Sequence, residues 1–268
     1  MGRYSPCYVP GVLEEGVSHM VLGSALDIFS RSGFAYLSRW SHVFVGITWI
    51  GLLYFFNFVQ VPAYAEMEGA ARNNAIDKLT SRALWWFRWA AAATLLSGIL
   101  LIIFQEQYEG DYIRSAPGVA IYAGVLLAVT MFLNVWLVIW PAQKVVIANA
   151  RNVQAGGEAD PNTAAAARKG ALASRMNTIY SLPMLIFMVG TSHFPYDVSV
   201  DASGSKRAVF WIIWIVIWGV LELNALGYLG GRGPGGPRII YDTHRNAIIT
   251  GFVYSAVALI LFSYILTS

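Results

Sequence analysis

Residues 38–61 read SRWSHVFVGITWIGLLYFFNFVQV, and the positions from 43 to 61 are nearly all apolar. An α-helix needs about 20 such residues to cross roughly 30 Å of hydrocarbon at ~1.5 Å per residue. The stretch therefore predicts a membrane-spanning helix over residues 34–61. His42 lies near the start of this helix, where an ionisable ring is costly unless it has a partner or a function.

The composition indicates an integral membrane protein. Of the 268 residues, 57% are apolar and 12% are charged, whereas soluble domains carry about 25% charged residues. The net charge of +3 does not indicate a nucleic-acid partner, because the basic residues are spread through short loops and form no stripe. The single cysteine, Cys7, excludes an internal disulfide and a C-x-x-C-H motif, so any haem must be bound non-covalently.

Five further apolar stretches complete a prediction of six spans. They cover residues 84–104, 118–140, 177–190 with a start near 171, 208–226 and 247–266. The expected fold is an all-α bundle of six transmembrane helices over residues 34–268. Residues 1–33 form a separate N-terminal segment, in which Leu13, Val17, Met20 and Val21 recur at helical spacing. This spacing predicts a short interfacial helix lying on the membrane surface.

The basic residues of the loops predict the orientation in the membrane. One face holds Arg72, Lys78, Arg82, Lys144, Arg151, Arg168, Lys169, Arg175, Arg232, Arg238 and Arg245, and the other holds Arg3, Arg31, Arg39, Arg114, Lys206 and Arg207. The richer face is expected to be cytoplasmic, because short cytoplasmic loops carry an excess of Lys and Arg. With an even number of spans, both termini then lie outside. On the inner face we expect a long loop over residues 142–169 and a Gly/Pro-rich loop over 230–237.

Two histidines are predicted at the same depth near the outer surface. His42 lies at the outer start of the first span, and His193 lies at the outer end of the fourth. A bis-histidine haem site needs two imidazoles at matched height on facing helices, so we expect His42 and His193 to ligate one haem b. Arg39 is placed to pair with a haem propionate. The alternative is that each ring is an interfacial anchor beside Trp and Phe, and that Arg39 only snorkels.

Two further positions carry weaker expectations. His244 follows the glycine-rich loop, where it either belongs to a second inner site or helps Asp242 and Thr243 to cap a helix. Glu222 and Arg88 both lie near the inner ends of their spans, so their depth permits an ion pair. An intramembrane carboxylate such as Glu222 is otherwise a candidate proton carrier.

Several motifs resemble a known family. Arg39-Trp40-Ser41-His42 and the segment 46–51, GITWIG, are similar to the first span of the membrane-bound bacterial urate hydroxylase (PuuD) family. The segments 139–144, IWPAQK, and 174–178, SRMNT, resemble its core, as do 181–184, SLPM, and 192–194, SHF. The resemblance covers roughly residues 36–195. A weaker similarity extends to small membrane haem proteins such as the HemJ-type protoporphyrinogen oxidase and to copper-resistance membrane proteins.

The resemblance implies a function. Members of this family oxidise urate to 5-hydroxyisourate and pass electrons to a C-terminal cytochrome c domain outside the membrane. This sequence ends at Ser268 and has no c-haem motif, so we expect electrons to pass to a separate periplasmic partner, such as a cytochrome c, or within a larger membrane complex. The resemblance also implies the bacterial inner membrane, so the two termini that the loop charges place outside are expected in the periplasm.

Two functional hypotheses follow from the sequence. The first is a membrane-bound haem-b oxidoreductase or electron-transfer protein. If histidines occupy both axial positions, the iron is closed to substrate and serves electron transfer, whereas an open position permits substrate oxidation. The second is a cofactor-free accessory subunit of a larger membrane complex. A reduced-minus-oxidised absorption spectrum of the purified protein distinguishes these hypotheses.

Overall fold

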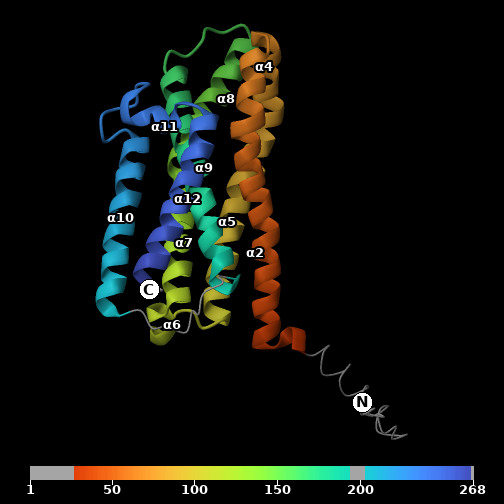
Figure 1. The fold of residues 1–268 in the computed structure, drawn as a ribbon. Coiled ribbons are helices and arrows are strands. Elements are labelled where there is room, and N and C mark those ends of the chain that lie inside the picture. Colours follow the sequence, from red (N-terminus) through yellow and green to blue (C-terminus); the bar gives the residue numbers. More distant parts are fainter. Residues whose placement is uncertain (1–26, 194–202, 267–268) are drawn as a thin grey trace, which may run out of the picture.

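The computed structural model describes residues 27–193 and 203–266. All regular elements in these ranges are helical, and six helices are long and apolar enough to cross a membrane. The predicted all-α, six-span fold is therefore confirmed (Figure 1). The interfacial helix predicted within residues 1–33 falls mostly outside the described residues.

The first two spans form a long helical hairpin. The first span consists of α2 (Arg31–Tyr54), the π-helix η2 (Phe55–Gln60) and α3 (Val61–Glu66), and it follows the short helix η1 (Asp27–Phe29). The second consists of α4 (Gly69–Ala75), the π-helix η3 (Ile76–Thr80) and α5 (Ser81–Phe104). Contacts between α2 and α5 are the most extensive in the described protein. The hydroxyl of Ser30 caps the start of α2 by accepting from the N–H of Gly33 at 3.2 Å.

The next two spans supply the centre of the bundle. After α6 (Gly110–Arg114), the third span runs through α7 (Ala116–Leu133), the π-helix η4 (Asn134–Ile139) and α8 (Trp140–Gln154). The fourth is α9 (Thr163–His193), which continues past Pro183. Helix α9 is the most buried of the spans and contacts α7, α8, α10 and α12. It is therefore the central helix of the bundle.

The last two spans pack on one side of this centre. They are α10 (Gly204–Leu226) and α12 (His244–Leu266), joined by η5 (Gly236–Arg238) and α11 (Ile239–Asp242). Gly227 ends α10 in the left-handed conformation, with φ of 88°, which glycine adopts without steric cost. The start of α2 and the end of α12 lie at the same end of the bundle (Figure 1), as an even number of crossings requires.

The first three spans are much longer than a membrane crossing. They comprise 36, 36 and 39 residues, and 36 residues of helix measure about 54 Å. Helices α10 and α12 have 23 residues each. The long spans extend past them at the α4/α8 end (Figure 1). The predicted long loop over 142–169 shrinks to residues 155–162, because α8 continues to Gln154 and α9 begins at Thr163, so that the alanine run expected to form a short helix is the start of α9. A hydropathy pattern predicts where a helix leaves the hydrocarbon core of the membrane, but it does not predict the residue at which the helix ends.

Two of the three π-helices have an evident cause. η2 is followed by Pro62 and η4 by Pro141, each at the start of the next α-helical segment. A proline inside a helix clashes with the carbonyl one turn earlier and lacks an N–H donor. The wider π turn accommodates both effects without breaking the helix. No proline accompanies η3.

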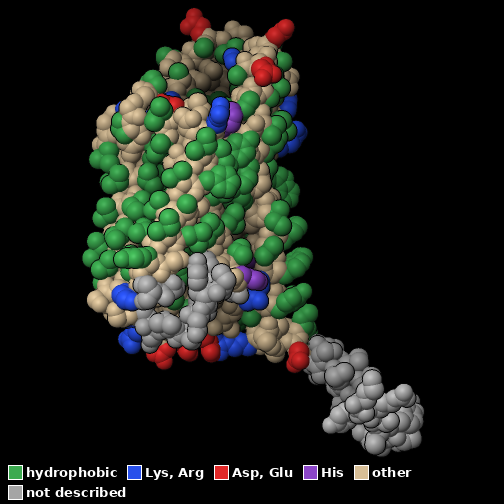
Figure 2. All heavy atoms as spheres, in the orientation of Figure 1, with side chains coloured by type: hydrophobic (Ala, Val, Ile, Leu, Met, Phe, Trp, Pro, Cys, Tyr) green, Lys and Arg blue, Asp and Glu red, His purple; other side chains and the backbone are tan. Residues whose placement is uncertain are grey.

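The surface agrees with a membrane location. Hydrophobic side chains cover the middle of the face in Figure 2, whereas Lys, Arg, Asp and Glu gather at its two ends. Large exposed apolar residues occur on several spans, among them Ile47, Leu96, Leu137, Ile212 and Ile260. Such a continuous apolar belt suits hydrocarbon and would be unusual in water.

Candidate functional site

A cavity of about 240 Å³, with a largely apolar lining that includes several polar side chains, lies between the first four spans, close to the α4/α8 end. Its polar lining comes from α2–α3, η3, α8 and α9, and comprises Asn57, Gln60, Tyr64, Thr80, Gln143, Ser174 and Arg175. Ligand pockets for drug-sized molecules measure roughly 300–1,000 Å³. This volume therefore suits a small molecule.

The π-helices bring several lining residues to the cavity. η2 contributes Phe56, Asn57 and Gln60, η3 contributes Ile76 and Thr80, and η4 contributes Ile139. An extra residue in a helical turn rotates the side chains that follow, and such π segments occur often at functional sites. Three of them around one cavity identify this region as the candidate site.

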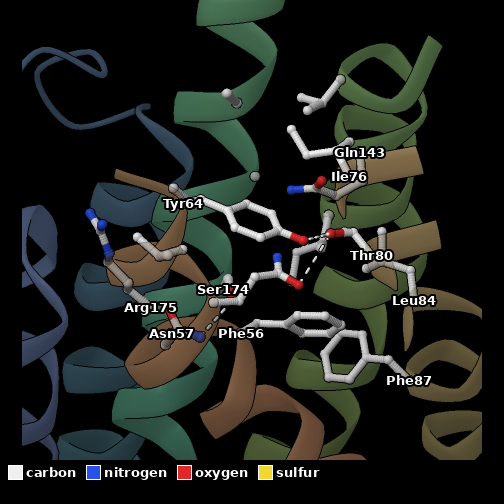
Figure 3. A pocket seen from close by; sticks show the side chains of 17 residues that line it. Phe56, Asn57, Tyr64, Ile76, Thr80, Leu84, Phe87, Gln143, Ser174 and Arg175 are labelled. Atoms are coloured by element: carbon white, nitrogen blue, oxygen red, sulfur yellow. Dashed lines mark hydrogen bonds between the residues drawn. The ribbon is translucent and has the colours of Figure 1, made fainter. Parts of the chain in front are cut away.

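The hydroxyls of Tyr64 and Thr80 form one polar wall together with Gln60. The Tyr64 hydroxyl lies 2.7 Å from Oγ1 of Thr80, and Thr80 donates in turn to Oε1 of Gln60 at 3.2 Å (Figure 3). The second of these hydrogen bonds occupies the amide oxygen of Gln60. The Nε2 group of Gln60 makes no hydrogen bond within the described residues and is available as a donor.

Asn57 forms the opposite wall. Its Nδ2 donates to the carbonyl of Leu53 at 2.9 Å and to Oγ of Ser174 at 2.8 Å, which ties the first span to α9 (Figure 3). Both amide hydrogens are thereby used. The Oδ1 atom of Asn57 has no protein donor among the described residues, so this wall offers an acceptor.

Gln143 has the largest unused hydrogen-bonding capacity. Its half-buried amide is directed into the cavity and makes no hydrogen bond to any described residue (Figure 3). The amide can therefore give two N–H donors and one carbonyl acceptor to a bound molecule.

The rings of Phe56 and Phe87 form an apolar floor below the amides (Figure 3). Their centroids are 5.3 Å apart, and their planes are perpendicular, at 90°. Phe87 is almost fully buried, so the floor is held by the core. A planar molecule can stack on such a surface while its edges meet the polar walls.

The one cation of the lining is turned away from the cavity. The guanidinium of Arg175 donates to the carbonyls of Tyr241 and Asp242, both at 2.8 Å, and Figure 3 shows it directed outward. Arg168 binds the carboxylate of Asp242 at 2.6 Å. Burial would raise the pKa of Asp242, but the Gly235 N–H and the Arg168 guanidinium outweigh burial and hold this pKa below its ordinary value. The two arginines thus fasten the segment after α10 to α9, and the cavity walls present neutral groups.

His42 has the arrangement of an oriented ligand. Its Nδ1 lies 3.0 Å from the carbonyl of Thr94 and 3.2 Å from Oγ of Ser97, both on α5. The carbonyl contact assigns the proton to Nδ1 and leaves Nε2 unprotonated, without a partner among the described residues. Metal-ligating histidines commonly donate their second nitrogen to a carbonyl in this way. His42 therefore fits an axial haem ligand.

His193 is the last residue of α9, and its ring is exposed. Its Nδ1 lies 3.1 Å from the carbonyl of Val189, so the ring can also present Nε2. Arg39 is exposed, and it lies three residues before His42 on the same face of α2. The main contact of α2 is with α5, whereas its contacts with α9 are few. No contact among the described residues joins His42, His193 and Arg39 in one site.

The polar cavity and the histidines are separate. His42 and Asn57 are 15 residues apart on one continuous helix, which corresponds to roughly 22 Å. Within the described residues, no three His, Cys, Asp or Glu side chains come together to hold a metal ion. A haem needs only one or two protein ligands, so the histidines stay candidates for it.

The two weaker expectations have clear outcomes. The ion pair between Arg88 and Glu222 is wrong, because the Arg88 guanidinium lies 3.9 Å from the ring centroid of Trp140, where it makes a cation–π contact. At His244, capping is performed by Thr243, whose Oγ1 accepts from the N–H of Asn246 at 3.0 Å. The ring of His244 lies against Phe58.

The cavity was not predicted from the sequence. Asn57 and Gln60 are visible as polar positions in an apolar span, and Gln143 follows the Trp-Pro pair at the end of the third. Each is unremarkable alone. The nearby prolines at 62 and 141 were the available signal, because a proline inside a predicted span indicates altered helical geometry.

Comparison with known proteins links the chain to one family. A family model described as "Urate oxidase N-terminal" matches residues 106–223. The chain is similar to the urate oxidase family. The matched region runs from before α6 through most of α10, and it includes Gln143, Ser174 and His193 but not His42. No curated protein matches the chain, and no solved structure does.

Proposed function

We propose that this chain is a membrane-bound oxidoreductase of the urate oxidase kind, and that urate or a similar planar heterocycle binds in the polar cavity. The observation that carries the proposal is the cavity itself, with neutral amides and hydroxyls above an aromatic floor. The family match supports the reaction class, since α8 and α9 supply three of the seven polar lining residues, Gln143, Ser174 and Arg175, from inside the matched region.

The chemistry of the walls suits this substrate class. Urate is flat and carries N–H donors and carbonyl acceptors around its rim. The amides of Gln60 and Gln143 and the Oδ1 of Asn57 provide both kinds of partner, while Phe56 and Phe87 contact the ring face. Such a site favours a substrate that fills every buried polar contact, because an analogue lacking one group leaves a wall atom unpaired.

The reaction requires an electron acceptor. Conversion of urate to 5-hydroxyisourate forms one C–O bond from water at C5 and releases two protons and two electrons. In this proposal the cavity residues bind and orient urate and limit access of bulk water. The electrons pass to a one-electron acceptor, and a periplasmic cytochrome c is the partner class that we propose.

A b-type haem is the second part of the proposal. His42 and His193 would ligate it near the α6 end, and Arg39 would face a propionate. The Nδ1 contacts of both rings support this assignment, because they leave each Nε2 unprotonated. When bound, the haem supplies a one-electron carrier between the cavity and the partner.

We also propose the bacterial inner membrane as the location, with both termini periplasmic. The cavity lies toward the basic α4/α8 end, which the loop charges favour as cytoplasmic. Substrate would then enter from the cytoplasm, and electrons would leave toward the periplasm.

The test combines activity and spectroscopy on the purified protein. Wild-type protein should oxidise urate with ferricytochrome c as acceptor and show a b-type α-band on reduction. His42→Ala and His193→Ala should each lose haem, whereas His244→Ala is the matched control and should retain it. A colourless wild-type protein that leaves urate unchanged refutes the proposal and favours a cofactor-free accessory subunit.

A further inference from the structure

Glu222 is the buried acid of this protein. Among the acidic residues that the structure describes, only Glu222 falls in the buried class, with 7% of its surface exposed. It lies on α10, where its carboxyl faces the amide of Asn134 and the hydroxyl of Tyr180. Its Oε2 atom has no hydrogen-bond partner among the described residues. A carboxyl in such a place is costly unless it has a function.

A row of polar side chains on α9 and η4, called the seam below, lies between this carboxyl and the cavity. Along α9, the side chains of Asn177, Thr178 and Ser181 are fully buried, and Ser174 of the same helix lines the cavity. Ser174 and Asn177 are three residues apart and so share one face of α9. Asn134 of η4 then donates to Oδ1 of Asn177 at 3.0 Å and also faces Glu222.

The remaining surroundings of Glu222 are neutral. Tyr180 from α9 donates its hydroxyl to the carbonyl of Trp218, and Tyr241 from α11 donates to the carbonyl of Leu221. On α12, the buried hydroxyl of Tyr254 has no partner in residues 27–193 and 203–266, and the Tyr254 ring lies next to that of Tyr180. Within the described residues, no cation forms an ion pair with Glu222.

We infer that Glu222 receives a proton released in the cavity, by way of the seam formed by Ser174, Asn177 and Asn134, and passes it to solvent. The inference rests on the proposed urate oxidation. One of the two protons released per turnover converts the Glu222 carboxylate to a carboxyl, and the other leaves through the cavity mouth. The two electrons go one at a time to two molecules of the one-electron acceptor, and the carboxyl is neither oxidised nor reduced. Glu222 does not contact the cavity and acts through the seam.

The alternative is a carboxyl that stays protonated for structural reasons. Such a group would exchange its proton only when the bundle opens, and its replacement by Gln would leave the pH dependence of turnover unchanged. A relay residue exchanges in the folded protein. The two roles therefore differ in a measurement that needs no substrate.

The first experiment is infrared spectroscopy of the purified full chain in D₂O. In acidic D₂O buffer, where the Glu222 carboxylate takes up a proton, wild-type protein should show a protonated carboxyl band that shifts promptly on deuteration and is absent from Glu222→Gln. Asn134→Leu keeps the carboxyl but interrupts the seam, so its band should exchange at least roughly tenfold more slowly. A wild-type band that does not exchange, or that exchanges equally fast in Asn134→Leu, overturns the inference even if Glu222→Gln does not fold.

The second experiment measures turnover with urate and ferricytochrome c. Glu222→Gln should lower kcat roughly 100-fold, at the lower end for loss of a proton-transfer group, with little change in KM and with one limb of the pH profile removed. Glu222→Asp should restore part of kcat. An unchanged kcat and pH profile overturns the inference. If wild-type protein does not oxidise urate, the proposed function fails, while the exchange experiment still decides the role of Glu222.

Discussion

Replacing Gln143 by Leu should weaken ligand binding without weakening the fold. The change nearly preserves the shape of the side chain and removes an amide that faces the cavity and makes no hydrogen bond within the described protein. A hydrogen bond to a charged ligand contributes about 1.5–3 kcal/mol. At 1.4 kcal/mol per tenfold change, loss of one such bond to the urate anion corresponds to roughly 10- to 150-fold weaker binding.

The assay is calorimetric titration of purified protein with urate, together with thermal unfolding. Gln154→Leu on the same helix is the matched control, because that amide donates to the carbonyls of Asn73 at 3.0 Å and Ala150 at 3.2 Å, away from the cavity. The control should lose about 1 kcal/mol of stability and keep its affinity. Unchanged affinity in Gln143→Leu, or equal destabilisation in both variants, refutes the role assigned to the cavity.

Two further predictions concern the ends of the bundle. A Cβ at Gly98 would lie 3.1 Å from Cε1 of His42, so Gly98→Ala should displace the ring and weaken haem retention. The control Gly51→Ala, on open helix surface, should keep its haem. Equal haem retention in the two variants, measured by pyridine haemochrome, would count against His42 as a ligand. The pKa of Asp242 is lowered in the folded protein, so the ionised carboxylate stabilises the α10–α12 connection fully above the ordinary Asp pKa of about 3.9. This stabilisation should be lost as the pH falls through the lowered pKa of the folded protein. Hydrogen exchange of residues 227–238 should therefore accelerate in acid, and Asp242→Asn should abolish that acid-dependent step.

Much of the fold was predictable because membrane crossing imposes one requirement on every span. Each span must offer about 20 apolar residues, and the segments at 34–61, 84–104 and 118–140 met this requirement in the sequence. Their continuation beyond the membrane was not predictable by hydropathy. Segments such as Trp140–Gln154 are polar on one side, so they are invisible to a search for apolar runs although they are helical.

The candidate site residues were likewise predictable from the sequence only in part. His42 was identifiable from sequence because an ionisable ring stands out in an apolar span, but its contact with Thr94 required the packing of α2 on α5. The Arg88 prediction failed for the complementary reason. Equal depth does not make two residues neighbours, and Arg88 faces Trp140 across the bundle rather than Glu222.

By itself, the sequence determined that this chain lies in a membrane, how often it crosses and which end carries more positive charge, since these properties are sums over local composition. Only the tertiary structure decided that amides from residues 57, 60 and 143 meet around one cavity. Asn57 and Gln60 lie on the first span and Gln143 lies on the third, so their convergence depends on how the two helices are rotated. Widened turns near two prolines set part of that rotation, and it becomes visible only when the helices are packed together.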